Sequence, residues 1–323
     1  MTLTNTQSNH IQILRGLAII AVVFIHNTPI GLSQVFIRPF LNFSVGLFLF
    51  LSGLLSNKAS YNPKKRIVKV IVPYIIWSFI YTCENNVGSL YEIPVDYLKS
   101  LFFGNSAAMM YYVLVYCQFT LLIPIIDKLS NSKYKYLGFI ISPLEIILMR
   151  TLLIITGYQE NIYIQNVMSI SCLGWFTYFY LGYLIGNKKQ VVNYNKSSLI
   201  GLLGISIALQ MLEGYWYWSL GYTNCGTQLK LSSILSGVFF AILGYKFINI
   251  KKTCNCRFLY VLGNYSFGIY FSHMAVMHVL NFLPYYTKYV VYPFNGVVVI
   301  LCSFIMCYIG KKILKKHSWI IAL

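Results

Sequence analysis

The sequence predicts an all-α membrane protein, a single bundle of about ten transmembrane helices with both ends of the chain in the cytoplasm. Three observations predict it: the composition, a series of long apolar segments, and the distribution of basic residues among the loops. Of the 323 residues, 58% are hydrophobic and only 10% are charged, and the mean hydropathy is +0.65. Soluble domains carry roughly 25% charged residues. Residues 1–323 are therefore expected to form one membrane-embedded domain.

Ten segments are apolar enough to cross a bilayer, because a helix needs about 20 mostly apolar residues to span the hydrocarbon core. The segments are 11–28, 36–56, 67–83, 108–126, 137–156, 168–186, 197–212, 229–248, 264–283 and 291–310. The seventh is short and is a candidate for a partly re-entrant segment. No Lys or Arg precedes the first segment and no cleavage site follows it, so we expect it to remain as an anchor.

The basic residues orient this bundle. Of the 25 lysines and arginines, 19 lie in the loops after the second, fourth, sixth and eighth segments or in the C-terminal tail. Five of the seven acidic residues lie in the opposite loops: Glu84, Glu92, Asp96, Glu160 and Glu213. Basic loops remain cytoplasmic, so both termini are expected inside. The net charge of +18 comes from these short clusters, which lack an aromatic-interleaved basic face, and no nucleic-acid partner is expected.

The cysteines indicate neither a metal site nor disulfides, and two glycines indicate close helix packing. Most of the eight cysteines lie in or beside apolar segments, where Cys behaves as a small hydrophobe. Cys254 and Cys256 form a C-x-C in a basic loop, but no His or second Cys pair is near in sequence. We therefore expect no metal site and reduced thiols. Gly182 and Gly186 form a G-x-x-x-G motif that predicts close helix packing.

The first predicted span carries two ionisable residues, Arg15 and His26, eleven positions apart. This spacing puts both on one helix face, within about 20° of each other and about 16 Å apart along the axis. An arginine near the cytoplasm can hold a phosphate-bearing ligand, and a histidine deeper on the same face can take a proton from a hydroxyl. The alternative is structural: Arg15 extends to the membrane interface, and His26 caps a polar helix end.

Other polar residues in the spans are candidates for the same site, because ionisable groups within a bundle usually line a cavity or pathway. Arg66 and Lys69 are three positions apart and can share a face at the cytoplasmic mouth, although ordinary loop charge also accounts for them. His273 and His278 are five apart and face different directions, and His273 is the deeper of the two. A buried, hydrogen-bonded core histidine is the alternative for His273.

Four more polar side chains lie inside predicted spans and are possible cavity-lining residues: Glu145, Arg150, Gln118 and Asn42. The two charged residues are five positions apart, so each is expected to find a partner on another span or on a ligand. The two amides are more simply explained as hydrogen-bonding groups between helices.

Taken in chain order, these motifs resemble the acyltransferase 3 family of bacterial membrane O-acyltransferases. The family opens with an Arg and a His separated by ten residues, as Arg15 and His26 are. Its second span carries a phrase similar to LFLFLSGLL at Leu47–Leu55. A basic R-x-x-R then precedes an aliphatic-Pro-Tyr step, which the chain matches with Arg66, Lys69 and VPYIIW.

Two later segments extend the resemblance. YYVLVYCQFTLLIPII at Tyr111–Ile126 is similar to an aromatic-rich stretch that ends in Leu-Pro, and SFGIYFSHM at Ser266–Met274 is similar to S-x-x-I-Y-L-x-H. The likeness covers all ten spans. Lys69 departs from the pattern, since it stands where the family usually has a second Arg. Lysine keeps the charge but loses the bidentate geometry for phosphate.

The resemblance implies a multi-pass protein of the inner (plasma) membrane that moves an acyl group from acyl-CoA to a glycan or glycolipid hydroxyl, and acetyl-CoA is the expected donor. It implies that Arg15, Arg66 and Lys69 bind acyl-CoA. His26 is then the catalytic residue, as a general base or an acyl relay. The donor is a substrate, and no permanently bound cofactor is expected.

Two other functions fit the same apolar sequence. An exporter or transporter of a polysaccharide or glycolipid would use the polar groups to line a pathway, but such folds often show inverted repeats with paired broken helices. Pro73, Pro124 and Pro143 are present without a convincing two-fold repetition. A non-catalytic scaffold or sensor would not depend on Arg15 or His26.

Overall fold

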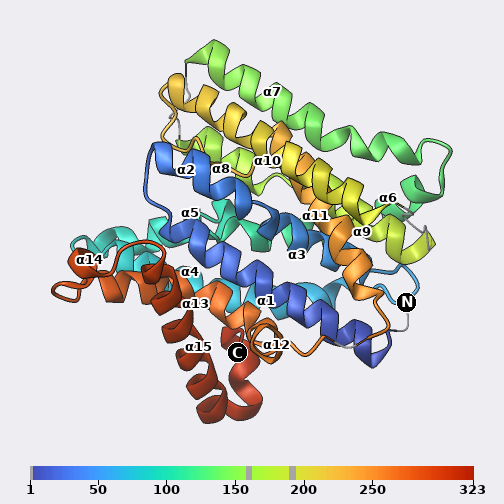
Figure 1. Ribbon diagram of the computed structural model, residues 1–323. Coiled ribbons are helices and arrows are strands. Elements are labelled where there is room, and N and C mark those ends of the chain that lie inside the picture. The colour runs from blue at the N-terminus through green and yellow to red at the C-terminus, as the bar shows by residue number, and fades with distance from the viewer. Residues whose placement is uncertain (1–2, 158–161, 189–193, 253) are drawn as a thin grey trace.

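The computed structural model describes residues 3–157, 162–188, 194–252 and 254–323, and within these ranges it contains helices and no strands (Figure 1). The α-helices are α1 (Asn5–Asn27), α2 (Leu32–Ile37), α3 (Phe43–Leu54), α4 (Pro63–Asn85), α5 (Ile93–Phe103), α6 (Tyr111–Asn131), α7 (Ile141–Thr156), α8 (Ile162–Ile170), α9 (Phe176–Lys188), α10 (Lys196–Ser219), α11 (Leu231–Ile248), α12 (Arg257–Asn264), α13 (Ser266–Asn281), α14 (Tyr286–Tyr289) and α15 (Phe294–Leu314). Short 3-10 turns link them, including η1 (Arg38–Phe40), η4 (Leu173–Trp175) and η5 (Lys315–Ile321).

Local sequence sets where these helices begin and end. Thr4 and Gln7 form a capping box at the start of α1, in which each side chain bonds the backbone N–H of the other. The Asn62 side chain accepts from the backbone N–H of Lys65 at the start of α4, whose first residue is a proline. α7 ends at Gly157, which has φ +68° and so adopts the left-handed conformation that glycine tolerates.

The predicted polytopic helix bundle is confirmed, with a lower count of spans. Within the described residues, eight helices are long and apolar enough to cross a membrane, and a pair of helices, 164–170 and 173–187, bent by 52°, makes a ninth if the pair counts as one span. The bend falls inside the predicted sixth segment. The predicted ninth segment, 264–283, forms the 16-residue α13, which is shorter than the length a straight span needs.

The seventh segment is longer than the sequence predicted. α10 runs for 24 residues, through Glu213 and the aromatic run that follows it. The helix tolerates this acidic residue because the Glu213 carboxylate is satisfied across the helix pair. It accepts from the Tyr217 hydroxyl at 3.1 Å and from the backbone N–H of Ser232, at the start of α11, at 3.0 Å.

The basic loops meet at one end of the bundle, which we call the basic end. Lys58, after α3, pairs with Asp127, near the end of α6, at 3.4 Å. Asn187 in α9 donates to the carbonyl of Ser56 at 2.8 Å. The start of α1 joins the same end, where the Gln7 side chain donates to that of Asn249 at 3.1 Å. Of the acidic residues assigned to the opposite loops, Glu160 lies outside the described residues.

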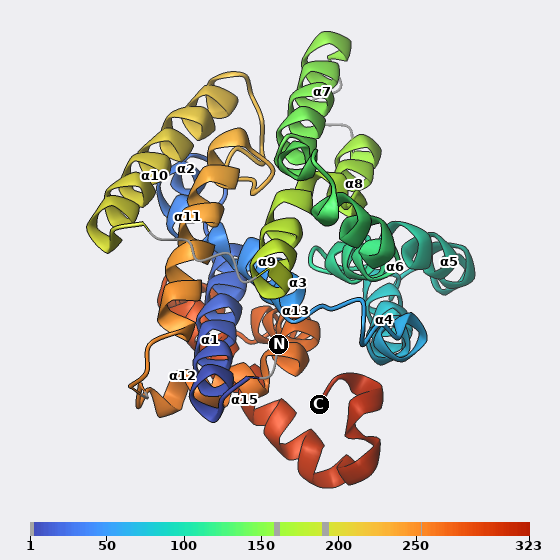
Figure 2. The ribbon, with the colours of Figure 1, turned by 90° about the vertical axis from the view of Figure 1, so that its right-hand side faces the viewer.

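The centre of the bundle is formed by α1 and α3, with α9, α11, α12 and α13 packed around them (Figures 1 and 2). The G-x-x-x-G prediction of close packing is confirmed. A Cβ atom at Gly182 would overlap the carbonyl of Phe50, and one at Gly186 would overlap the carbonyl of Leu54. α9 therefore lies directly against the backbone of α3.

The outer helices keep apolar side chains on their surfaces. In Figure 2, α7 and α10 lie at the edge of the bundle. Leu144, Leu148 and Leu152 on α7 are exposed, as are Ile205 and Leu212 on α10. A surface of this kind is expected for helices that face lipid chains. The protein is a multi-pass membrane protein.

Candidate functional site

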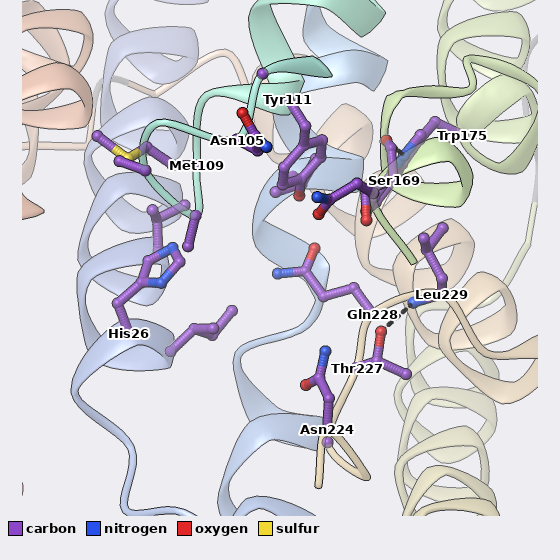
Figure 3. A pocket seen from close by; sticks show the side chains of 18 of the residues that line it. His26, Asn105, Met109, Tyr111, Ser169, Trp175, Asn224, Thr227, Gln228 and Leu229 are labelled. Atoms are coloured by element: carbon purple, nitrogen blue, oxygen red, sulfur yellow. Dashed lines mark hydrogen bonds between the residues drawn. The ribbon is translucent and has the colours of Figure 1, made fainter. Parts of the chain in front are cut away.

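His26 lines a cavity of about 580 Å³ at the end of the bundle opposite the basic end, and we call this the outer cavity (Figure 3). The last turn of α1 supplies His26, and the 3-10 turn η1 supplies Arg38. The loop between α5 and α6, helix α8 with η4, and the segment 224–229 before α11 form the other walls. Five elements distant in sequence thus converge on the histidine.

The outer cavity combines side-chain amides with aromatic rings. Its amides are Asn105, Asn166, Asn224 and Gln228. The rings of Tyr111 and Trp175 stack with their centroids 5.7 Å apart at 19°, and both line the cavity. Amides can bond hydroxyl groups as donors or acceptors, so the lining suits a polar ligand that also has an apolar face.

The oxygen of one of these amides has no hydrogen-bond partner among the described residues. The Oε1 atom of Gln228 is buried and accepts no hydrogen bond from the described residues. Figure 3 shows its side chain extending into the space between His26 on one side and Tyr111 and Ser169 on the other. Buried polar atoms are normally hydrogen-bonded, so an unpaired oxygen in the lining of the outer cavity is a candidate acceptor for a ligand donor.

His273 lies beside the catalytic candidate. Its ring centroid is 5.3 Å from that of His26, and its side chain is fully buried. The Nδ1 atom of His273 lies 3.0 Å and 2.8 Å from the carbonyl oxygens of Ile269 and Tyr270. Because carbonyls only accept, Nδ1 carries the proton, and the buried Nε2, which has no partner in the described structure, is left as an acceptor.

The three predicted acyl-CoA-binding residues come together elsewhere. Arg15, Arg66 and Lys69 line one cavity of about 530 Å³ toward the basic end, which we call the basic cavity. The Arg66 guanidinium also donates to the Ser56 hydroxyl at 2.8 Å. None of the described residues that line this cavity is acidic. A group of cations without a carboxylate favours an anionic ligand.

Tyr270 lines both cavities. Its hydroxyl donates to the carbonyl of Met109, in the loop before α6. The first two residues of α6 also face different cavities. Tyr111 lines the outer cavity and Tyr112 lines the basic cavity. The thickness of one aromatic side chain therefore separates the two cavities at Tyr270.

The remaining predicted residues lie outside the linings of both cavities. The two amides bond between elements, as the simpler explanation predicted. Asn42 donates to the Gln210 side chain at 2.9 Å. Gln118 donates to the carbonyl of Ile170 at 2.8 Å and accepts from the N–H of Cys172 at 3.1 Å, which bridges the bend between α8 and α9.

The two charged residues on α7, Glu145 and Arg150, also lie outside the linings of both cavities. Arg150 donates to the carbonyl of Leu229 at 3.1 Å and lies over the Tyr217 ring at 5.0 Å. One carboxylate oxygen of Glu145 is buried and has no hydrogen-bond partner among the described residues. Arg150 therefore has a partner on another element, as the spacing predicted, whereas this oxygen of Glu145 has none among the described residues.

Arg38 and the segment 224–229 are the parts of the outer cavity that sequence reasoning missed. Arg38 donates to the Asn224 side chain at 3.0 Å and to the carbonyl of Ile25 at 3.3 Å, directly before His26 in the chain. One signal was present in the sequence. Arg38 lies at the start of the second predicted segment, 36–56, on the side where lysines and arginines are scarce.

The structure is a helical membrane bundle in which His26 lines a polar cavity and three cations line a second cavity that shares Tyr270 with it. The family model described as an acyltransferase domain, that of acyltransferase 3, matches residues 9–314, nearly the whole chain. The chain belongs to this family and is a membrane acyltransferase. Comparisons with curated proteins and with solved structures returned no match.

Proposed function

We propose that this protein transfers an acyl group, specifically acetyl, from acyl-CoA to a hydroxyl of a cell-surface polysaccharide or lipid-linked glycan at the plasma membrane. One observation carries the proposal: His26 and the cluster of Arg15, Arg66 and Lys69 lie in two cavities that share Tyr270. A transferase with one substrate on each side of a membrane needs such an arrangement.

The basic cavity is the proposed donor site. Coenzyme A carries several phosphate charges, and arginine is well suited to bind them because its planar guanidinium can bond two oxygens at once. The basic end would face the cytoplasm by the charge rule for membrane loops, and acyl-CoA is available there. The acyl thioester would then point along the cavity toward Tyr270.

The outer cavity is the proposed acceptor site. Sugars present hydroxyl groups around their rims and weakly apolar C–H faces. The amides of Asn105, Asn224 and Gln228 can bond the hydroxyls, and the stacked rings of Tyr111 and Trp175 can pack against the faces. This lining supports a glycan more than an alkyl acceptor.

In the proposed reaction, the acceptor hydroxyl gives its proton to His26 while its oxygen attacks the thioester carbonyl. A new C–O bond forms, the C–S bond breaks, and the coenzyme leaves as a thiolate. The proton held by His26 then passes to that sulfur, so atoms and charge balance. A relay through an acyl group on His26 would give the same products in two steps.

Replacing His26 tests this function. His26→Ala in purified protein in nanodiscs should lower glycan acylation by acetyl-CoA by about 10²- to 10⁴-fold, the usual contribution of a general base. His317→Ala is the matched control, since His317 is exposed and lines neither cavity. Mass spectrometry of surface glycans from cells with each variant gives a second measurement. Near-normal acylation by His26→Ala would overturn the mechanism.

A further inference from the structure

The segment 224–229, which forms one wall of the outer cavity, is held by three cationic side chains. Arg38 donates to the side chain of Asn224 at 3.0 Å. Lys230 is fully buried and donates to the carbonyl of Cys225 at 3.3 Å. Arg150 donates to the carbonyl of Leu229 at 3.1 Å. The three come from different elements, η1, the start of α11, and α7.

None of these cations forms an ion pair within the described ranges, although Glu213 lies near Lys230. Glu145 and Glu213 lie on the neighbouring helices α7 and α10, but neither lines the cavity. Within the described ranges, no carboxylate oxygen lies within 4.0 Å of a nitrogen of Arg38, Arg150 or Lys230. Glu213 is instead satisfied by neutral donors on Tyr217 and Ser232. Charges without counter-ions inside a membrane protein are costly and usually mark a functional site.

Arg38 is the one of the three that faces the cavity. Its terminal nitrogens hold Asn224 and the carbonyl of Ile25, but its Nε atom is buried and has no hydrogen-bond partner among the described residues. The Gln228 oxygen in the same cavity is also without a partner. The lining of the cavity therefore includes a cation with an unpaired donor and an amide with an unpaired acceptor.

We propose that the acceptor carries a negative charge, as a carboxylate or phosphate on the sugar, and that Arg38 selects it. This inference rests on the proposed function and specifies its acceptor. The anionic group would face Arg38 at the outer end of the cavity. A hydroxyl of the same sugar would then lie between Gln228 and His26. The charge of Arg38 would be compensated only when acceptor is bound, which favours anionic over neutral glycans.

Two sources offer this chemistry, an acidic sugar such as a uronate and a sugar on a phosphorylated lipid carrier. The test uses the purified protein in nanodiscs with labelled acetyl-CoA. Surface glycans of the source cell are sorted by anion exchange into neutral and uronate-bearing oligosaccharides, and a prenyl-phosphate-linked sugar is the third acceptor. We expect at least a tenfold higher kcat/KM for one anionic acceptor than for the neutral one, and the preferred acceptor identifies the source.

Arg38→Gln should remove this preference without changing the KM for acetyl-CoA, and Arg38→Lys should keep most of it. Size-exclusion profiles show whether each variant is folded. If Arg38→Gln fails to fold, the three acceptors are compared with the wild type at increasing salt concentration instead. The preference for the anionic acceptor should shrink as screening increases. Equal kcat/KM for neutral and anionic acceptors, or a preference that survives Arg38→Gln, overturns the inference while leaving acyl transfer intact. Failure of all three acceptors would count against the proposed function itself.

Discussion

The imidazole rings of His26 and His273 lie 5.3 Å apart, centroid to centroid, and are inclined by 43°. His26 belongs to α1 and His273 to α13, two helices at opposite ends of the sequence. The fixed Nδ1–H of His273 leaves its Nε2 as the acceptor next to the His26 ring. A neutral neighbour of this kind can bond an N–H of His26 and so select which nitrogen of His26 takes the substrate proton.

His273→Phe should therefore lower kcat by about tenfold or more, equivalent to about 1.4 kcal/mol in the barrier, with little change in the KM for acyl-CoA. His273→Gln, whose amide oxygen can also accept, should recover part of the rate. The pH dependence of kcat should shift in His273→Phe, because His26 loses a neighbour that affects its proton. If His273 has only a structural role, the folded fraction of His273→Phe should show the same pH profile as the wild type.

The basic cavity predicts an effect on donor binding. Arg66→Ala should weaken coenzyme A binding by about tenfold or more, since a hydrogen bond to a charged group contributes about 1.5–3 kcal/mol. Lys69→Arg should preserve or strengthen binding, because it restores the bidentate geometry. Isothermal titration with coenzyme A measures both. Lys128→Ala is the control, as Lys128 is an exposed lysine at the basic end outside the cavity; an equal loss in that variant would show that general surface charge is responsible.

Replacing Tyr270 by Phe or by Ala should affect acyl transfer differently, because the first change removes only the hydroxyl and the second removes the ring. Tyr270→Phe keeps the ring between the cavities and should retain most transfer activity. Tyr270→Ala should join the cavities and admit water to the thioester, so acyl-CoA hydrolysis without acceptor should rise relative to transfer. Release of free coenzyme A by the folded fraction measures this ratio. The same ratio in both variants would contradict a dividing role for the ring.

The contact between α3 and α9 predicts a stability effect. Gly182→Ala places a methyl group against the carbonyl of Phe50, and overpacking of this kind typically costs about 1–3 kcal/mol. Gly201→Ala is a matched control, because a Cβ at Gly201 on α10 meets no atom within 4 Å. The control should be neutral or stabilising by up to about 1 kcal/mol. Thermal unfolding in detergent, followed by size exclusion, compares the two.

Much of this arrangement was readable from sequence because membrane helices constrain it strongly. Arg15, Arg66 and Lys69 were each placed at the cytoplasmic end of a predicted span, and the structure brings them into one cavity. The position of His26 at the opposite end of α1 followed from helix geometry. The spacing of Gly182 and Gly186 predicted a close helix contact, which is present.

What sequence missed depends on contacts between distant segments. Arg38 is held by Asn224, which is 186 positions away, and by the carbonyl of Ile25 on α1. The bend within the sixth predicted segment is bridged by Gln118 from another helix. Likewise, α10 extends past Glu213 because α11 supplies donors to that carboxylate. Hydropathy reports the apolar length of each segment and carries no information about such partners.

In the proposed function, the ring of Tyr270 would also limit what has to cross the bilayer. Taking a nucleotide with its phosphates, or a hydroxyl-rich sugar, through hydrocarbon would require stripping many polar groups of water. With the donor on one side of this ring and the acceptor on the other, as proposed, only the few carbons of the acyl group change sides. The cell surface would be modified from a cytoplasmic supply while the membrane stays closed to protons and ions.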